Sequence, residues 1–357
     1  MSTPEERAWE VVRRAYEERP PAPPRPRRIR ARTLAALVAL AVAGAVLSPS
    51  GQAVLERVRR TVGIGHAAPV LVALPSPGRL LVVSPKGASI VDSDGARHRL
   101  GSFTDADWSP HGLYVVATRR NELVALDPQG KVHWTLARRG PAWPRWTGTY
   151  TDTRIAYVSA GGLHVVAGDG TGDRLLAADA GDAPPAWDPA RRFAVAYASA
   201  GAILLRRDDG TLLWRRPVPA LPHDLSWSSD GRELAVFGRR AVVVLDGRGR
   251  LLRTIRFGGL VDGAFEPGSH RLAVSVRLPG RSEVRLVDGS ARRLLLAGPG
   301  AFGELAWSPD GRWLLVTWPA ADQWVFVHGT RARAVARIRA QFQQGPLQVA
   351  GRWCCAR

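Results

Sequence analysis

A pattern of one aromatic residue, a short polar turn and an apolar run recurs along most of the chain. The turn is rich in Ser, Pro, Asp and Gly, and the run that follows is rich in strand-forming residues. An aromatic residue precedes six of these turns: Trp108, Trp146, Trp187, Trp227, Phe265 and Trp307. A degenerate seventh copy reads Leu74-Pro75-Ser76-Pro77-Gly78, and consecutive copies lie about 40 residues apart. This spacing indicates an internal repeat.

Each repeat has room for four short strands. Pro presets φ at the second turn position and Gly tolerates positive φ, so Ser-Pro-Asp-Gly closes a tight turn. After the turn at Trp227, residues 234–237 and 241–245 form apolar runs, and residues 250–255 form a basic outer run. Four strands of four to six residues with their turns use about 40 residues. A period of this length built only from strands and turns is typical of a β-propeller.

We therefore predict an all-β fold, a seven-bladed β-propeller over residues 68–357, with six or eight blades as alternatives. The aromatic residue before each turn is expected on the innermost strand, where its ring fills the gap to the next blade. Residues 345–355 are too short for a blade and are expected to supply a closing strand that ties the last blade to the first.

Two families share these motifs. The Trp-Ser-Pro-Asp-Gly repeats, clearest at residues 307–311, resemble those of TolB-like and WD-repeat-like bacterial propellers over roughly residues 68–342. The segment Ala125 to Trp134 resembles the A-x-D-x-x-G-x-x-x-W repeat of quinoprotein-like propellers, and Asp209 to Trp214 is a partial second copy. The first resemblance implies the fold and says little about function. The second implies tryptophans that lock neighbouring blades together.

The first 19 residues predict a short amphipathic helix with an apolar stripe that includes Trp9, Val12 and Tyr16. Such a short helix cannot bury this stripe alone, so it binds a partner, lies on a membrane or frays. Its glutamates would be repelled by anionic headgroups, which favours a cytoplasmic protein partner bound through the three stripe residues.

Residues 20–32 form a Pro/Arg-rich linker, and the apolar residues 33–51 predict a single transmembrane helix. The arginines of the linker place the N-terminus inside by the positive-inside rule. A cleaved signal peptide, with Ala41-Val42-Ala43 or Ala43-Gly44-Ala45 as its processing site, and a merely buried helix are the alternatives. Residues 52–67 predict a juxtamembrane amphipathic helix that rides on the membrane or packs against the propeller.

The basic excess is large but dispersed. The chain holds 50 Lys and Arg against 31 Asp and Glu, a net charge of +19. No single stripe of charge stands out, so the simplest interpretation is arginine scattered over outer strands, where charge protects blade edges. Attraction to anionic envelope polymers or lipid headgroups is the alternative. We do not expect nucleic-acid binding by a domain that lies outside the cell.

The sequence contains no zinc-protease, nucleophile-elbow or P-loop motif, and its histidines have no metal-ligand spacing. Five acidic residues precede the aromatic anchors and could point into the central channel: Asp105, Asp107, Asp224, Asp262 and Glu304. Such a ring of carboxylates could bind a cation or a polyamine, or simply cap turns at the channel mouth. The only cysteines, Cys354 and Cys355, are adjacent and form either two free thiols or a vicinal disulfide.

These features predict a binding or sensor module in the bacterial cytoplasmic membrane, with its N-terminus inside and its propeller outside. It would take protein partners and no cofactor, and the N-terminal helix would relay to a cytoplasmic partner. This layout resembles that of membrane-bound anti-sigma regulators. Two alternatives remain: a quinoprotein-like oxidoreductase that uses quinone with Ca²⁺, and a TolB-like envelope scaffold. The fold cannot decide among them.

Overall fold

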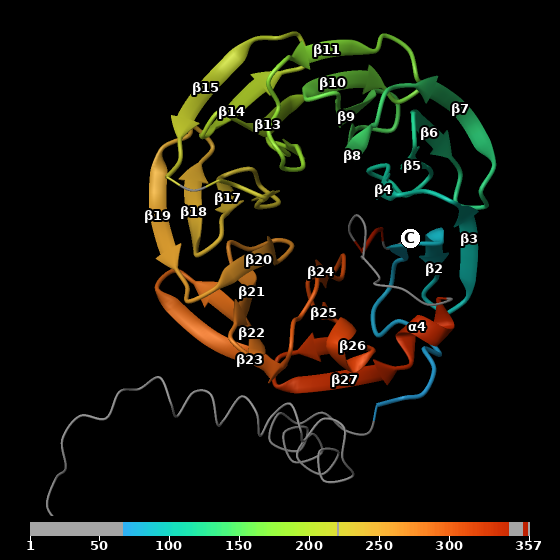
Figure 1. The fold of residues 1–357 in the computed structure, drawn as a ribbon, viewed down its shortest axis with the longest axis vertical. Helices are drawn as coiled ribbons and strands as arrows, with labels where there is room; N and C mark the ends of the chain where they lie inside the picture. The colour runs from blue at the N-terminus through green and yellow to red at the C-terminus, as the bar shows by residue number, and fades with distance from the viewer. Residues whose placement is uncertain (1–66, 220, 343–352, 356–357) are drawn as a thin grey trace, which may run out of the picture. The chain divides into compact units, whose positions relative to one another are not determined.

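The computed structural model describes residues 67–219, 221–342 and 353–355. In this part of the chain, seven antiparallel sheets follow one another around a ring, and strands within each sheet are neighbours in sequence (Figure 1). The prediction of a seven-bladed β-propeller is therefore confirmed. Among the described residues, no helix has both the length and the apolar character to cross a membrane. The predicted helices and linker within residues 1–66 lie outside the described residues.

Among the described residues, six blades have four strands and the first has three. Blades 1 to 4 contain, in order, β1 (Leu80–Ser84), β2 (Gly87–Val91) and β3 (Arg97–Gly101); β4 (Asp105–Trp108), β5 (Val115–Arg119), β6 (Glu122–Leu126) and β7 (Val132–Ala137); β8 (Ala142–Gly148), β9 (Thr153–Ser159), β10 (Gly162–Ala167) and β11 (Arg174–Ala177); and β12 (Ala186–Trp187), β13 (Ala194–Ser199), β14 (Ala202–Arg207) and β15 (Leu212–Pro217).

Blades 5 to 7 contain β16 (Asp224–Trp227), β17 (Glu233–Phe237), β18 (Ala241–Asp246) and β19 (Leu251–Arg256); β20 (Leu260–Phe265), β21 (Leu272–Leu278), β22 (Arg281–Asp288) and β23 (Ala291–Pro299); and β24 (Leu305–Trp307), β25 (Leu314–Trp318), β26 (Gln323–His328) and β27 (Arg331–Ala336). A 3₁₀ turn, η1 (Pro319–Ala321), and a short helix, α4 (Ile338–Gln341), complete the described elements.

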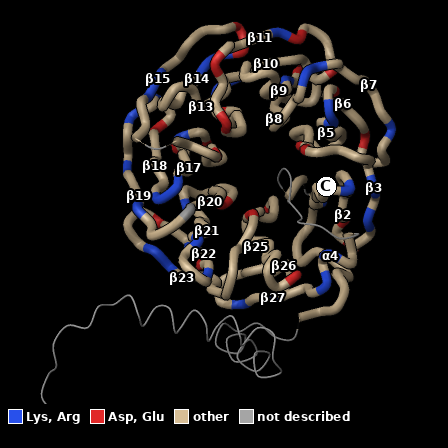
Figure 2. The backbone as a smooth tube through the Cα atoms, viewed as in Figure 1, with Lys and Arg blue, Asp and Glu red and all other residues tan. Residues whose placement is uncertain are grey.

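The hydrophobic pattern follows the depth of each strand in its blade. The second strands β13, β17 and β25 are buried at every position, because each sheet packs against a neighbouring blade on both faces. The outer strands β7, β15 and β19 are largely exposed and alternate in burial. Arginines mark most of these outer strands, as Figure 2 shows. The dispersed basic charge thus covers blade edges, as the sequence predicts.

The Ser-Pro-Asp-Gly turns are held by their own side chains. In blade 5 the Ser228 hydroxyl donates to Asp230 and accepts the Glu233 N–H, and the Gly231 N–H donates to the Ser228 carbonyl. Gly231 has a φ of +66°, a conformation that glycine adopts without strain. The turn from Ser308 in blade 7 repeats these contacts. Local chemistry alone therefore specifies how each inner strand reverses into the second.

The C-terminus supplies the missing inner strand of blade 1. Arg79 and Cys354 form an isolated bridge with two backbone hydrogen bonds of 2.8 and 2.9 Å, so the segment closes the ring where the sequence analysis expected it to. Residues 345–352 of the predicted closing strand lie outside the described residues. Arg79 precedes β1 as Tyr114 precedes β5, and the Tyr114 carbonyl accepts the N–H of Ser109. This register places Trp353 where blade 2 has Trp108.

The copy at Leu74 therefore supplies only the turn of blade 1, and its aromatic anchor comes from the other end of the chain. A second tie joins the ends of the ring. Ala68 pairs in parallel with β27, exchanging backbone hydrogen bonds with Ala334 and Ala336.

The anchor tryptophans join neighbouring blades. The indole N–H groups of Trp187, Trp227 and Trp307 donate to backbone carbonyls of the inner strand before them, at 2.8, 3.2 and 3.2 Å. The partner is thus the preceding blade, whereas the sequence analysis placed the rings toward the next blade. In each case the acceptor is the residue directly before the anchor of the preceding blade: Arg145, Ala186 and Ala264.

Two other tryptophans join their own outer strands, β7 and β15, to the following blade. Trp134 Nε1 donates to the Gly168 carbonyl at 2.9 Å, and Trp214 Nε1 donates to the Gly247 carbonyl at 3.1 Å. The ring of Trp134 lies so close to Gly170 that a Cβ atom there would approach it to 2.8 Å. These are the tryptophans of the quinoprotein-like segments, and both act here as locks between blades.

Candidate functional site

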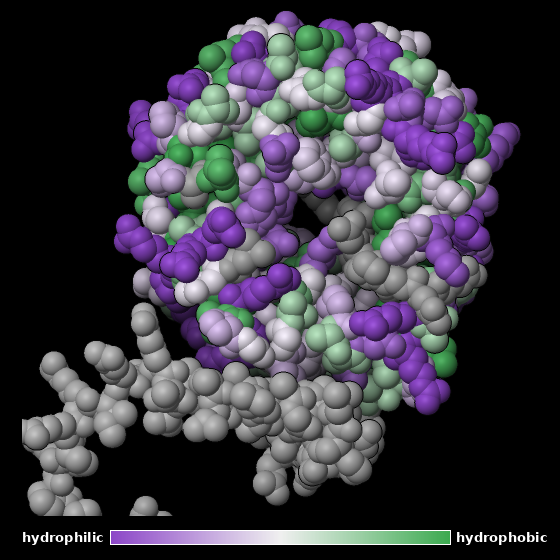
Figure 3. Space-filling view, viewed as in Figure 1, coloured by the Kyte–Doolittle hydropathy of each residue, from purple (hydrophilic) through white to green (hydrophobic). Residues whose placement is uncertain are grey.

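The five predicted channel residues line one cavity. Asp105, Asp107, Asp224, Asp262 and Glu304 all border a space of about 520 Å³. They come from the inner strands β4, β16 and β20 and from the residue before β24. Figure 3 shows the hollow at the centre of one face of the ring, and Figure 2 shows acidic positions at the inner ends of several blades.

Four of these carboxylates occupy one repeated position. Asp105, Asp224, Asp262 and Glu304 each lie three residues before the aromatic anchor of their blade. The same position is Trp143 in blade 3 and Pro184 in blade 4, and both also line the cavity. The repeat therefore brings equivalent positions of separate blades to one cavity. Acidic residues occupy four of these positions and give the cavity its acidic lining.

The two acids of blade 2 also hold blade 3 in place. Asp105 accepts the backbone N–H of Trp143 at 3.0 Å, and Asp107 accepts that of Trp146 at 2.9 Å. These bonds cross from β4 to β8, so the two side chains have a structural role whatever else they do. The sequence analysis expected such acids to cap turns at the channel mouth, whereas Asp105 and Asp107 bond to N–H groups of a strand in the neighbouring blade.

Glu304 differs from the acids of blade 2. Its carboxyl group makes no hydrogen bond within the part of the chain that the structure describes, and the side chain is half-buried. The pKa of Glu304 is raised from 4.5 to about 8. Loss of hydration is the largest cause, and the nearby carboxylates of Asp262, Asp224 and Asp105 add to it. Glu304 is therefore mainly protonated at neutral pH.

Burial also raises the pKa of two aspartates. For Asp105, the raised pKa persists against the opposing effects of Arg145 and two backbone N–H donors. For Asp262, it persists against the Gly263 N–H and the nearby His223. Burial therefore favours the protonated form of both carboxyl groups more than the neighbouring donors and charges favour the ionised form.

Sequence reasoning missed two residues of this site. Arg145 and His223 line the cavity with the acids. Burial by itself lowers the pKa of Arg145, but four carboxylates outweigh it and raise that pKa above its ordinary value: Asp105, Asp107, Asp224 and Glu304. Arg145 directly precedes the anchor Trp146, as Asp107 precedes Trp108, so the repeat itself contained the signal that places Arg145 on the channel.

The arrangement suits an extended cation better than a small metal ion. Within residues 67–219, 221–342 and 353–355, no group of three or more His, Cys, Asp or Glu side chains is arranged to hold a metal. The five carboxylates come from four blades, with Asp105 and Asp107 both on β4, and they surround a wide space. Such spacing matches a ligand with several N–H donors, such as a guanidinium or a polyamine.

The remaining predicted site residues lie elsewhere. Cys354 and Cys355 are joined in a disulfide in the structure, within the closing strand of blade 1. Cys355 Sγ lies 3.6 Å from the carbonyl oxygen of Pro110 in blade 2, and neither cysteine lines the central cavity. Trp9, Val12 and Tyr16 lie outside the described residues, so their predicted partner-binding role stays a prediction.

Solved structures share the fold at low sequence identity. A putative 6-phosphogluconolactonase from Bacteroides uniformis has a TM-score of 0.54 and 14% identity, covering 72% of this chain and 97% of that one. The β-propeller domain of Cps50 (Swd1) from Myceliophteria thermophila has a TM-score of 0.52 and 11% identity, covering 65% and 84%. A chain of a mitotic checkpoint complex has a TM-score of 0.52 and 16% identity, covering 65% and 78%.

These likenesses establish the propeller fold alone. No model of a known protein family matches the chain. No curated protein matches it either.

Proposed function

We propose that this chain is a protein-binding module whose central cavity receives a cationic side chain of its partner. The observation that carries the proposal is the gathering of five carboxyl groups around one cavity of about 520 Å³. A propeller of similar fold in a mitotic checkpoint complex supports a role in protein assembly. A negative cavity would repel phosphate groups, which agrees with the expectation that nucleic acid is not a partner.

Glu304 gives this binding a measurable signature. A guanidinium close to its carboxyl group favours the ionised form and lowers its pKa. Because the pKa of Glu304 is about 8 in the protein alone, binding of a cation near pH 7 releases a proton from the protein. Proton release therefore reports occupation of the cavity rather than attachment elsewhere on the surface.

Calorimetry at pH 7 tests the proposal. The full-length protein is titrated with a short peptide containing two arginines, and separately with spermidine, in two buffers of different ionisation enthalpy. We expect the peptide to bind more tightly than spermidine and to release protons. The double variant Asp224→Asn with Asp262→Asn should lose binding at least tenfold, whereas the exposed control Asp288→Asn should not. Tighter binding of spermidine would indicate a small-molecule cation instead, and no cavity-dependent binding would end the proposal.

We further propose that residues 33–51 anchor the protein in the bacterial cytoplasmic membrane with the propeller outside. The charge asymmetry around the apolar segment supports this orientation. A cysteine at Ser2 or at the exposed Asp288, each in a Cys354→Ser and Cys355→Ser background, is treated with a membrane-impermeant thiol reagent in intact cells. Only the cysteine at position 288 should react. Labelling at position 2 without lysis would reverse the orientation.

The N-terminal helix would pass the state of the propeller to a cytoplasmic protein. Its support is the apolar stripe with Trp9 at its centre, next to Val12 and Tyr16. Peptide 1–24 is used to capture proteins from lysate, with Trp9→Ala as the matched variant. Proteins that depend on Trp9 support the relay. The same proteins with both peptides, or none with either, would remove it.

A titration decides the oxidoreductase alternative separately. The quinoprotein-like segments support it through sequence, although their tryptophans act in the structure as locks between blades. Quinone with Ca²⁺ is added to the purified protein, and absorbance and reduction of an artificial electron acceptor are followed. Saturable quinone binding with turnover would establish the enzyme, and its absence would leave the binding module and the TolB-like scaffold.

A further inference from the structure

The central cavity contains a cation as well as acids. Arg145 lies on β8 of blade 3 and borders the cavity of about 520 Å³. Its Nη1 donates to the carbonyl oxygen of Pro144 at 2.9 Å. Among the described residues, its guanidinium makes no other hydrogen bond and no ion pair, so most of its N–H donors are unused. The nearby carboxylates thus act on Arg145 through space and do not hold it by contact.

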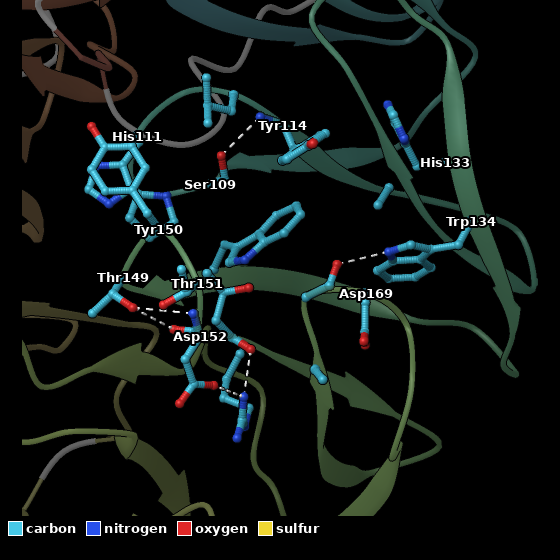
Figure 4. A pocket seen from close by; sticks show the side chains of 18 residues that line it. Ser109, His111, Tyr114, His133, Trp134, Thr149, Tyr150, Thr151, Asp152 and Asp169 are labelled. Carbon is cyan, nitrogen blue, oxygen red and sulfur yellow. Dashed lines mark hydrogen bonds and ion pairs between the residues drawn. The ribbon is translucent and has the colours of Figure 1, made fainter.

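A second cavity, of about 430 Å³ between blades 2 and 3, shows a contrasting arrangement (Figure 4). The arginine that lines it, Arg154, forms ion pairs with Asp152 and Asp208. Its charge is therefore already compensated, and a ligand would have to compete with these carboxylates for it. The guanidinium of Arg145 in the central cavity is open to a ligand, because no carboxylate among the described residues is in contact with it.

Acidic groups with unused oxygens lie across the channel from Arg145. Asp262 is on β20 of blade 6 and Glu304 directly precedes β24 of blade 7, and Figure 1 shows these strands on the far side of the channel from β8. Asp262 Oδ1 accepts the N–H of Gly263 at 2.7 Å, and Glu304 has no partner among the described residues. The unpaired atoms of these side chains are not enclosed, so a ligand in the cavity can reach them. The channel thus presents a cation on one side and carboxyl groups on the other.

We infer that the cavity receives the C-terminal arginine or lysine of a partner protein, whose carboxylate binds Arg145 and whose side chain reaches the acids of blades 6 and 7. This inference rests on the proposed function and specifies that the cationic residue is the last one of its chain. The planar guanidinium of Arg145 can hold a carboxylate through two parallel N–H bonds. A C-terminal arginine carries that carboxylate and, one side chain away, a cation for Asp262 and Glu304.

A ligand with a single charge fits the cavity less well. A cation alone would displace water from Arg145 and leave its donors without a partner, which costs free energy. An anion alone would bind Arg145 but would bring negative charge into a space lined by five acidic residues. A C-terminal arginine or lysine satisfies both sides of the channel and adds no net charge from its own residue.

Calorimetry on the full-length protein at pH 7 compares two forms of one acetylated tripeptide that ends in arginine, with a free carboxylate or with an amide at the C-terminus. The amide has the more positive net charge, so an acid-lined cavity in which Arg145 played no part would prefer it. We expect the opposite order: the free acid should bind at least tenfold more tightly, the effect of a charge-assisted hydrogen bond. Free arginine should bind more weakly than the acetylated acid, because its ammonium group would lie beside Arg145.

Variants assign this preference to Arg145. Arg145→Gln should reduce the preference to less than about twofold and still bind the amide, because the acids remain; retained binding of the amide also shows that the variant is folded. Arg145→Lys keeps the charge but not the planar fork, and should keep an intermediate preference. The matched control Arg248→Gln removes an exposed arginine outside the cavity and should leave the tenfold preference unchanged.

The outcomes separate this inference from the proposed function. Equal binding of the two peptides, or tighter binding of the amide, would overturn the inference and leave a cavity that binds cations. If neither peptide binds, both proposals fall. A preference for the free acid that persists in Arg145→Gln would show that another group holds the carboxylate, and it would also overturn the inference. Tighter binding of free arginine than of the acetylated acid would identify a free amino acid as the ligand instead of a protein terminus.

Discussion

Replacing Glu304 by glutamine should change how the stability of the propeller depends on pH. The pKa of Glu304 rises from 4.5 to about 8 in the folded protein, so the folded state holds its proton more tightly than the unfolded state does. The stabilisation from this difference is complete below pH 4.5 and is lost progressively as the pH rises toward 8. Glutamine does not titrate, so Glu304→Gln lacks this loss.

The magnitude follows from the pKa difference. At 1.36 kcal/mol per pKa unit, the change from 4.5 to about 8 corresponds to at most about 5 kcal/mol, of which up to about 4 kcal/mol falls between pH 5 and 8. Urea denaturation of the wild type and of Glu304→Gln at several pH values in this range measures it. The variant should gain stability relative to the wild type as the pH rises.

The control for this experiment is Glu122→Gln. Glu122 is 40% exposed and forms an ion pair with Arg119 in blade 2. The substitution removes one negative charge without touching the cavity. Its stability should run parallel to that of the wild type. If the curve for Glu304→Gln also stays parallel within about 1 kcal/mol, burial does not hold the proton on Glu304 and the reasoning fails.

Three further predictions concern the joints between blades. In urea denaturation, Gly170→Ala should destabilise the protein by about 1–3 kcal/mol more than Gly210→Ala. Both glycines have positive φ, but only Gly170 lies against a tryptophan, Trp134. Equal losses of stability would show that this contact is not tight. Trp187→Phe should cost about 1 kcal/mol more than Trp146→Phe, because only the Trp187 N–H has a bonded partner; the reverse order in thermal unfolding would contradict the assignment. Trp353→Ala should cost about 3–5 kcal/mol, because Trp353 is 3% exposed in the closing strand, and an unchanged melting temperature would mean that the ring does not depend on this closure.

The fold was largely predictable because its determinants are local and repeated. Each turn, such as Ser228 to Gly231, reverses the chain through its own hydrogen bonds, and each buried strand is recognisable as an apolar run. Seven copies of the repeat therefore predict seven similar blades. The N-terminal helix, linker and membrane segment come from sequence patterns alone, and they remain predictions.

The candidate site was predictable in part for the same reason. The acids at Asp224, Asp262 and Glu304 sit at a fixed distance before their anchors, and the fold places equivalent positions of different blades around one axis. Arg145 followed the same rule, but its blade has a worn copy of the motif without the full turn. Because this copy of the motif is weak, the sequence analysis missed Arg145, although the fold places it at the position that Asp107 has in blade 2.

Only the tertiary structure decided the contacts that join distant segments. Trp353 reaches blade 1 because the ring closes there, across almost the whole propeller sequence, and no local pattern states that pairing. The cavity between blades 2 and 3 likewise has a lining drawn from both blades, such as Tyr114 from blade 2 and Tyr150 from blade 3. A repeat specifies what each blade is, because strand and turn chemistry acts over a few residues. The fit between particular blades depends on side chains brought together by closure of the ring, so it emerges only when the whole ring is assembled.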